Sequence, residues 1–332
     1  MTDSPLLEIT DLCVEFRTRS GVLPAVRGVS LRVEAGRTLG IVGESGSGKS
    51  VTMMAAMGLL PPTARVTGSV RLGGRDLLDL GPRAWQAVRG ARMGMIFQDP
   101  MTALNPVMTV GEQIVEAIRL HRRDLSARAA LERAVELLAT VSISQPRERA
   151  RQYPHEFSGG MRQRVMIAMA IANEPELLIA DEPTTALDVT VQAQILDMLS
   201  RLRADLGIGL VLITHDLGVV AGCADTVAVM YGGRVVETAD TEDLFYRTRH
   251  PYTIGLLGAS PRVEGEIRPL VPVEGAPPIL SRLPPGCAFN PRCSWAQVRC
   301  REEAPVLRSV GAVRTACHRA EELADMQTEG SR

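Results

Sequence analysis

The residue types best suited to chemistry lie in residues 43–50, whose sequence is GESGSGKS. This segment fits the pattern G-x-x-x-x-G-K-[ST], in which glycines let the backbone curl so that its N–H groups point at a phosphate. Lys49 is expected to reach the β- and γ-phosphates of a nucleotide, and the Ser50 hydroxyl to bind Mg²⁺. A flexible Gly/Ser turn is the alternative, but an apolar strand and helix flank the motif, as a phosphate site requires. The predicted nucleotide-binding residues here are Gly43, Glu44, Ser45, Gly46, Ser47, Gly48, Lys49, Ser50 and Val51.

Two adjacent carboxylates provide the second candidate. Residues 177–183 read LLIADEP, an apolar run of strand length that ends in Asp181 and Glu182. We expect both acids at the carboxyl edge of a sheet, with Asp181 holding Mg²⁺ and Glu182 polarising an attacking water. Such a pair alone could be plain turn residues, and only its combination with the phosphate loop makes catalysis the better interpretation. The chain has no N/T-K-x-D motif for guanine, which favours adenine.

Short apolar runs and helical stretches alternate along the chain and predict an α/β fold. Alternation of this kind predicts a mostly parallel sheet with helices on both faces. Residues 100–170 contain no strand pattern, so we expect a helical subdomain there. Strands are expected at 7–16, 31–33, 38–42, 93–97, 177–180, 210–214 and 227–230, and helices at 51–60, near 110–140, at 158–172 and at 189–206.

Composition excludes several classes of protein. The net charge of −1 argues against a dedicated nucleic-acid binder, and 3% aromatic residues argue against a base-stacking surface. The longest apolar run, residues 165–172, is far shorter than the roughly 20 residues of a membrane span. The N-terminus lacks the features of a secretory signal. We therefore expect a cytosolic protein that reaches a membrane only through a partner.

Prolines and cysteines mark a different C-terminal region. Of the 21 prolines, 10 lie in residues 251–305, so we place a boundary near 250 and expect loops and short elements beyond it, wrapping from the body to the cysteine tail. The cysteines there have the spacing C-x5-C-x6-C-x16-C, which lacks the C-x2–4-C pairs of common zinc sites. Three interpretations remain open: an iron–sulfur cluster, a zinc site with His318 among its ligands, and no metal at all. The four candidate ligands are Cys287, Cys293, Cys300 and Cys317.

Residues 157–164, FSGGMRQR, add a family-specific pattern. Together with the phosphate loop and the acid pair, they make residues 6–250 resemble the ATPase subunit of an ABC transporter. The segments FQDPMTALNP at 97–106 and TTALDVTVQA at 184–193 resemble the oligopeptide/dipeptide import branch. ITHDLGVV at 213–220, HPYT at 250–253 and the cysteine tail are also typical of that branch.

The resemblance implies a P-loop fold with a RecA-like core, an antiparallel β subdomain, a helical subdomain and a small Cys-rich C-terminal extension. It also implies a sandwich of two ATPases with ATP between them, in which Ser158, Gly159 and Gly160 of one subunit face the γ-phosphate held by the other. The catalytic residues would then be Glu182, His215, Lys49 and Gln98. Asp188 would bridge the subunits, Phe16 would stack on adenine, and Gln98 would sense Mg²⁺ or the lytic water. The cysteines of this branch are interpreted as [4Fe–4S] ligands.

The chain departs from the family pattern at Met161, where many ABC ATPases have Gln. A glutamine could close a capping box with Ser158, and Met cannot, so we expect a weaker helix start. Such a weakened start suits a heterodimer with two unequal ATP sites.

The resemblance implies an ATP-hydrolysing subunit of a peptide importer, with residues 1–250 as the ATPase domain and 251–332 as the C-terminal domain. Its implied partners are a second ATPase subunit, two transmembrane permeases and an extracytoplasmic solute-binding protein, with no nucleic acid. Its implied place is the cytoplasmic face of the membrane. Nickel or glutathione import, a soluble ABC ATPase of DNA repair or translation, and an iron–sulfur regulator with a relic ATPase are the alternatives.

Overall fold

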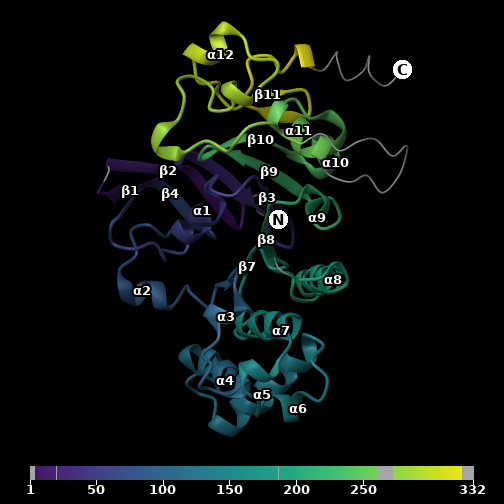
Figure 1. Ribbon diagram of the computed structural model, residues 1–332. Coiled ribbons are helices and arrows are strands. Elements are labelled where there is room, and N and C mark those ends of the chain that lie inside the picture. The colour runs from purple at the N-terminus through teal and green to yellow at the C-terminus, as the bar shows by residue number, and fades with distance from the viewer. Residues whose placement is uncertain (1–3, 20, 186, 260–271, 324–332) are drawn as a thin grey trace. The chain divides into compact units, whose positions relative to one another are not determined.

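The computed structural model describes residues 4–19, 21–185, 187–259 and 272–323 (Figure 1). Contacts divide the chain into two compact units, each built from segments that are separate in sequence. The first unit comprises Met1–Leu6, Val33–Arg37 and Asp79–Leu212, and the second comprises Leu7–Arg32, Thr38–Leu78 and Ile213–Arg332. Part of the predicted C-terminal wrap, residues 260–271, lies outside the described residues.

In the first unit, parallel strands carry the acid pair. Strand β6 (Met93–Ile96) pairs with β7 (Leu177–Asp181), and every residue of β7 is buried. Strand β8 (Gly209–Thr214) begins in this unit, where the Gly209 N–H donates to the Glu176 carbonyl. Burial on both faces explains why these strands are continuous apolar runs rather than alternating ones.

The chain between β6 and β7 is helical, as predicted. Its described elements contain no strand. They are α3 (Pro100–Ala103), α4 (Val110–His121), α5 (Ala127–Thr140), α6 (Pro146–Arg149), the 3₁₀ turn η1 (Pro154–Glu156) and α7 (Gly159–Ala170), with α2 (Pro82–Gln86) before β6 and α8 (Val189–Leu206) after β7.

Helix α4 shows why these segments are helical. A capping box joins Thr109 and Glu112: the Glu112 N–H donates to the Thr109 hydroxyl at 3.3 Å, and the Thr109 N–H donates to the Glu112 carboxylate at 2.8 Å. Ile114 and Ile118, four residues apart, lie on one face and are buried.

The second unit begins with an antiparallel sheet of order β2-β1-β4-β5. Strand β1 (Leu7–Thr18) pairs with β4 (Ala64–Leu72), with an irregularity between Thr10 and Cys13. The prediction of a strand over 31–33 alone was too short, because β2 extends over Gly21–Val33; β5 is the short strand Arg75–Asp76. The missed part of β2 contains Pro24 and Gly28, residue types that weaken a strand pattern.

A second set of strands in this unit has the order β11-β12-β10-β9-β3. Strand β3 (Thr38–Val42) lies parallel to β9 (Thr226–Tyr231), and β9 is antiparallel to β10 (Arg234–Asp240). The C-terminal segment extends this sheet through β12 (Val313–Thr315) and β11 (Arg308–Val310). The associated helices are α1 (Lys49–Ala56), α9 (Leu217–Ala221), α10 (Thr241–Arg247) and α11 (Pro251–Ala259).

Helix α1 is shorter than predicted. The helix expected over 51–60 begins at Lys49 and ends at Ala56. Gly58 has a φ of 60°, a left-handed conformation that stops helix continuation, and two prolines follow at 61 and 62.

Residues 272–323 form short elements, as the proline content predicts. They are η2 (Leu280–Arg282), η3 (Asn290–Arg292) and α12 (Val298–Glu302), followed by β11 and β12. Phe289 anchors this C-terminal segment: its ring meets Tyr231 at 5.2 Å and Tyr252 at 5.4 Å between centroids. These aromatic contacts tie the segment to β9 and α11.

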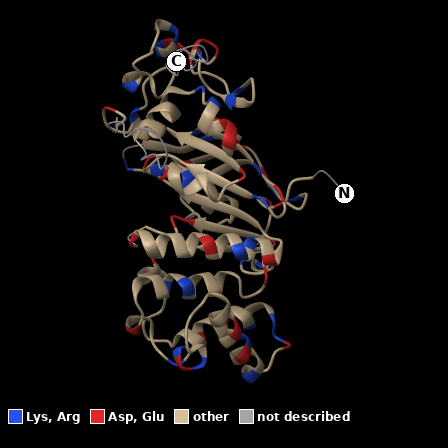
Figure 2. Ribbon diagram, turned by 90° about the vertical axis from the view of Figure 1, so that its right-hand side faces the viewer, with Lys and Arg blue, Asp and Glu red and all other residues tan. Residues whose placement is uncertain are grey.

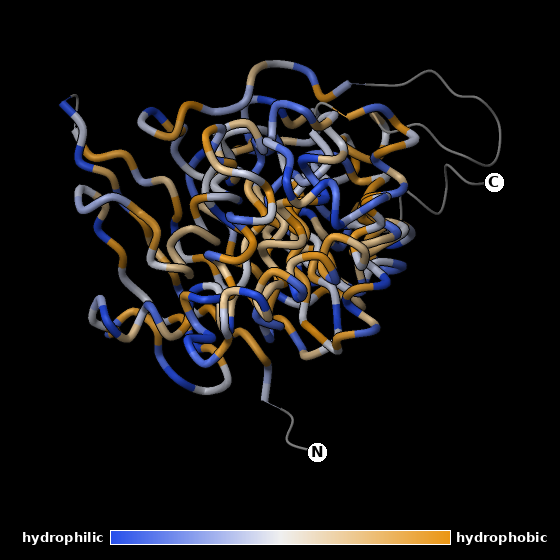
Figure 3. Tube along the Cα trace, turned by 90° about the horizontal axis from the view of Figure 1, so that it is seen from below, coloured by the Kyte–Doolittle hydropathy of each residue, from blue (hydrophilic) through white to orange (hydrophobic). Residues whose placement is uncertain are grey.

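Among the described residues, no helix combines the length and the apolar character needed to cross a bilayer. Hydrophilic residues interrupt the hydrophobic stretches along the drawn chain (Figure 3). Basic and acidic residues are interspersed along the ribbon (Figure 2), in keeping with the net charge of −1.

The buried His250 makes stability depend on pH. Its side chain lies at the start of α11 and is 1% exposed, and its Nδ1 accepts the Tyr252 N–H at 3.1 Å. Burial lowers the pKa of His250 from 6.5 to about 4. Between pH 6.5 and about pH 4 the unfolded chain therefore binds a proton that the folded chain does not. This group should cost about 2 kcal/mol of stability between pH 7 and pH 5.

We expect His250→Asn to remove the contribution of His250 to the pH dependence of stability. The variant should therefore lose less stability than the wild type between pH 7 and pH 5. Urea unfolding at both pH values measures it, and His155→Asn, at an exposed position, is the matched control. An identical pH dependence in the wild type and His250→Asn would contradict the assignment.

Candidate functional site

The phosphate loop lies between β3 and α1 in the second unit. At Gly43 the backbone is packed so closely that a Cβ would lie 2.2 Å from the Met230 carbonyl oxygen, which only glycine permits. Lys49 is 5% exposed, and its Nζ donates to the carbonyls of Gly43 at 2.7 Å and Glu44 at 3.0 Å. The ammonium group is therefore enclosed by the loop, and its contact with nucleotide phosphates stays a prediction.

Glu44 is held by residues that the sequence analysis missed. Its carboxylate accepts two hydrogen bonds from the Arg292 guanidinium, and its N–H donates to the Tyr252 hydroxyl at 2.9 Å. The separations of 248 and 208 residues explain the omission, because no local pattern connects such distant positions.

In the first unit, Gln98 and Glu182 lie together at the ends of β6 and β7. The Gln98 amide donates to Glu182 Oε2 at 2.9 Å, and the Thr185 hydroxyl donates to the same oxygen at 2.9 Å. Glu182 has a φ of 45°, an unfavourable conformation of the kind that clusters at functional sites. Asp181, at the end of the buried strand, is 6% exposed. Thr185 was missed, although a hydroxyl three residues after an acid is a recognisable local signal.

Helix N-termini position the remaining predicted residues of the first unit. Ser158 precedes α7 and accepts the Met161 N–H at 3.4 Å, near the outer limit of a hydrogen bond. A Cβ on Gly160 would lie 2.6 Å from Val191, so glycine permits the close approach of α7 and α8. Asp188 caps α8 by accepting the Val191 N–H at 3.0 Å. Gly159 is the first residue of α7. Both α7 and α8 thus begin with a side-chain cap.

Four further predicted residues lie in the second unit. Phe16 is half-buried on β1, opposite Ala64 of β4. His215 directly follows β8 and is exposed, next to Asp216, which caps α9 by accepting the Gly218 N–H at 2.7 Å. Ser50 and Val51 lie in the first turn of α1. These positions are compatible with the predicted roles, which stay predictions.

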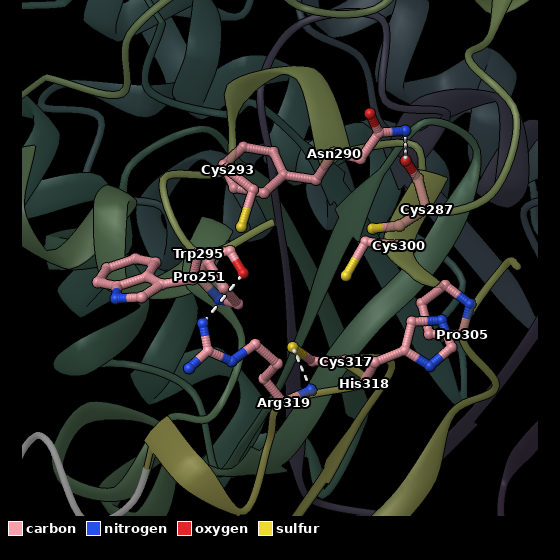
Figure 4. A pocket seen from close by; sticks show the side chains of 11 residues that line it. Pro251, Cys287, Asn290, Cys293, Trp295, Cys300, Pro305, Cys317, His318 and Arg319 are labelled. Carbon is pink, nitrogen blue, oxygen red and sulfur yellow. Dashed lines mark hydrogen bonds between the residues drawn. The ribbon is translucent and has the colours of Figure 1, made fainter. Parts of the chain in front are cut away.

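The C-terminal cysteines line one small pocket, together with Pro251, Trp295 and His318 (Figure 4). Burial raises the pKa of the Cys293 thiol to about 11 and of the Cys317 thiol to about 12. Within the described ranges, however, no group of three or more His, Cys, Asp or Glu side chains is arranged to hold a metal ion. The structure gathers Cys287, Cys293, Cys300 and Cys317 but does not confirm the predicted [4Fe–4S] site.

Comparison with known families identifies the chain. Residues 26–185 match the family model described as "ABC transporter". Residues 236–300 match a second model, described as "Oligopeptide/dipeptide transporter, C-terminal region". An oligopeptide transport ATP-binding protein OppD of Salmonella typhimurium is 51% identical over 96% of this chain and 95% of its own length. The chain belongs to the ABC transporter family.

Other relatives agree with this membership. The oligopeptide transport ATP-binding protein OppD of Mycobacterium bovis is 57% identical over 96% of this chain, which spans only 52% of that longer relative. The dipeptide transport ATP-binding protein DppD of Bacillus subtilis is 51% identical over 89% of this chain and 88% of its own length.

Solved structures support the ABC cassette fold. A dimeric, post-hydrolysis structure of the ATP-binding cassette MJ0796 bound to ADP and Pi has a TM-score of 0.64 and 28% identity. The structural match covers 71% of this chain and 98% of the MJ0796 chain. The predicted α/β ABC ATPase fold is therefore confirmed.

The hydrogen bond from the Met161 N–H to the Ser158 hydroxyl is long, and this leads to a prediction about the start of α7. Met161→Gln should add a second capping interaction at the start of α7 and change ATP turnover less than about tenfold, because one cap contributes about 1 kcal/mol. Steady-state ATPase assays measure the turnover, with Met161→Leu as a control that cannot cap. Complete loss of nucleotide-dependent assembly in Met161→Gln would contradict a modest role for this position.

Proposed function

We propose that this chain is the ATP-hydrolysing subunit of an ABC importer for peptides. One observation carries the proposal: a single chain combines an ABC transporter cassette with an oligopeptide/dipeptide transporter C-terminal region. Its relatives are named oligopeptide and dipeptide transport ATP-binding proteins, and these names support the same substrate class. An importer of nickel or glutathione is the alternative within this branch.

We assign a catalytic or binding role to the predicted site residues of each unit in turn. In the second unit, Lys49 and the loop 43–50 bind the phosphates of ATP, Ser50 binds Mg²⁺, and Phe16 stacks on adenine. His215 stabilises developing charge on the γ-phosphate. In the first unit, Asp181 holds Mg²⁺ and Glu182 polarises the lytic water, supported by the strand-end position of both acids. The Gln98–Glu182 hydrogen bond supports a role for Gln98 in sensing this water.

The proposed assembly is a pair of ATPase subunits with ATP between them. Ser158, Gly159 and Gly160 would meet the γ-phosphate bound by the opposite subunit, and Asp188 would contact that subunit. The N-terminus of the 12-residue helix α7 supports this proposal, because its N–H groups and dipole favour an anion. A heterodimer with unequal sites, two permease subunits and an extracytoplasmic solute-binding protein would complete the transporter.

The proposed location is the cytoplasmic face of the membrane, with the permeases as the attachment. We retain the proposed division into an ATPase domain, residues 1–250, and a C-terminal domain, residues 251–332. A soluble ABC ATPase of DNA repair or translation is less consistent with the C-terminal region match at 236–300.

Glu182→Gln tests the hydrolytic mechanism. The variant should bind ATP but lose most of its ATPase activity, because an amide cannot accept the proton of the lytic water. We expect an ATP-loaded dimer to accumulate, measured by size-exclusion chromatography with MgATP. Glu174→Gln, an exposed substitution, is the control. Hydrolysis at the wild-type rate in Glu182→Gln would show that the base is assigned wrongly.

We also propose that the four C-terminal cysteines hold a [4Fe–4S] cluster, with zinc as the alternative. The shared pocket of four sulfur side chains supports a soft metal site, since thiolates are the ligands that iron–sulfur clusters and zinc prefer. Binding would require deprotonation against the raised pKa values of Cys293 and Cys317, which makes it pH-dependent.

Anaerobically purified protein should therefore absorb near 400 nm and contain iron, and Cys300→Ser should lose both signals. Cys223→Ser, outside the pocket, is the matched control. Zinc in place of iron by elemental analysis would support the alternative, and a protein free of both metals after anaerobic purification would refute the metal site.

A further inference from the structure

We propose that Arg292 is a positioning residue for ATP binding: it fixes the phosphate loop through Glu44 and thereby sets the affinity for nucleotide. The proposal concerns a side chain outside the phosphate-loop motif, contributed by the C-terminal segment. It rests on the proposed role of residues 43–50 as the phosphate site. Both residues lie in the second unit, whose internal contacts carry the argument.

The contact between Arg292 and Glu44 is a two-bond ion pair. Arg292 Nη1 donates to Glu44 Oε2 at 2.7 Å, and Nη2 donates to Oε1 at 2.9 Å. The Arg292 side chain is 6% exposed and that of Glu44 is 22% exposed, so water screens the pair weakly. Hydrogen bonding to Glu44 raises the pKa of Arg292 further above its usual value. Paired N–H···O bonds of this kind fix geometry as well as charge.

The C-terminal segment holds the Arg292 guanidinium in place. Arg292 Nε donates to the Glu274 carbonyl at 2.8 Å, and Nη2 also donates to the Val273 carbonyl at 3.2 Å. The guanidinium carbon lies 5.8 Å from the ring centres of both Tyr231 and Phe289. The position of Glu44 is therefore coupled to the folding of residues 273–292.

Glu44 in turn is bound through its backbone as well as its side chain. Its N–H donates to the Tyr252 hydroxyl at 2.9 Å, and its carbonyl accepts from Lys49 Nζ at 3.0 Å. A displacement of Glu44 therefore moves a carbonyl that orients the Lys49 ammonium. The phosphate loop needs this ammonium and its own N–H groups at defined positions before it meets a triphosphate.

Removing one partner of a weakly screened ion pair leaves the other charge uncompensated, which is worse than removing both. Arg292→Gln leaves the Glu44 carboxylate without its counterion, beside a site that must accept the negative phosphates. Glu44→Gln leaves the Arg292 cation unpaired and weakens the link to the loop. The double variant has neither uncompensated charge, so the two single effects should not add.

The test measures nucleotide binding and steady-state kinetics of the full-length chain. We expect Arg292→Gln to raise the Kd of a fluorescent ATP analogue and the KM for MgATP about tenfold, with kcat changed less than about twofold. Glu44→Gln should raise both constants less, because the Arg292 cation that it leaves unpaired attracts the phosphates while the link to the loop is weakened. The Kd of the double variant should be no higher than that of the single variant that binds the analogue less tightly. Arg292→Lys should recover only part of the affinity, because an ammonium cannot form the two-bond contact.

Arg299→Gln is the matched control, because Arg299 pairs with Glu303 in the same segment but both side chains are exposed. It should bind nucleotide like the wild type. Unchanged affinity in folded Arg292→Gln, or single effects that simply add, would overturn the proposal. Should Arg292→Gln fail to fold, Glu44→Gln and Arg292→Lys decide by the same measurements.

Lys49→Ala separates this proposal from the site assignment on which it rests. It should abolish binding of the same analogue. If Lys49→Ala retains affinity, residues 43–50 are not the phosphate site. If Lys49→Ala loses affinity while Arg292→Gln and Glu44→Gln keep it, the site is assigned correctly and the positioning role of Arg292 is wrong.

Discussion

The backbone curl that encloses the Lys49 ammonium is the constraint on which the second unit depends. Three nearby elements maintain it: β9, whose Met230 carbonyl leaves room only for glycine at position 43; α11, whose Tyr252 binds the Glu44 N–H; and the C-terminal segment, whose Arg292 binds the Glu44 carboxylate. The strands β11 and β12 and the Phe289 contacts fasten that segment to the same sheet. The phosphate loop is thus supported by parts of the chain more than 180 residues away.

The first unit holds carboxylates and helix N-termini at defined positions. A fully buried strand delivers Asp181 and Glu182 to its end, where Gln98 and Thr185 bind one oxygen of Glu182. Serine and aspartate caps begin α7 and α8, and Gly160 lets those two helices approach closely. The helix caps and the strand that ends in two acids use interactions within a few residues, which explains why the local sequence already indicates them. The Gln98–Glu182 hydrogen bond joins residues 84 positions apart, and no local pattern indicates it.

The C-terminal segment shows where local patterns stop being informative. Its prolines predict short elements, and short elements are present, but nothing in the spacing predicts that β12 pairs with β10. The cysteine spacing fits no common zinc pattern, yet the four cysteines line one pocket. Helix α1 and strand β2 have bounds that differ from those predicted, because a left-handed Gly58 and long-range strand pairing decide where they end.

The sequence by itself determined the α/β class, the helical block between β6 and β7, the phosphate loop, the acid pair and the family resemblance. These depend on residue types within a few positions of each other, where steric and hydrogen-bonding preferences act directly. Only the tertiary structure decided the partners of Glu44, the acceptance of two hydrogen bonds by Glu182, the burial of His250 and the gathering of the cysteines. Those depend on which distant segments pack together, and packing is set by the whole core rather than by neighbours in the chain.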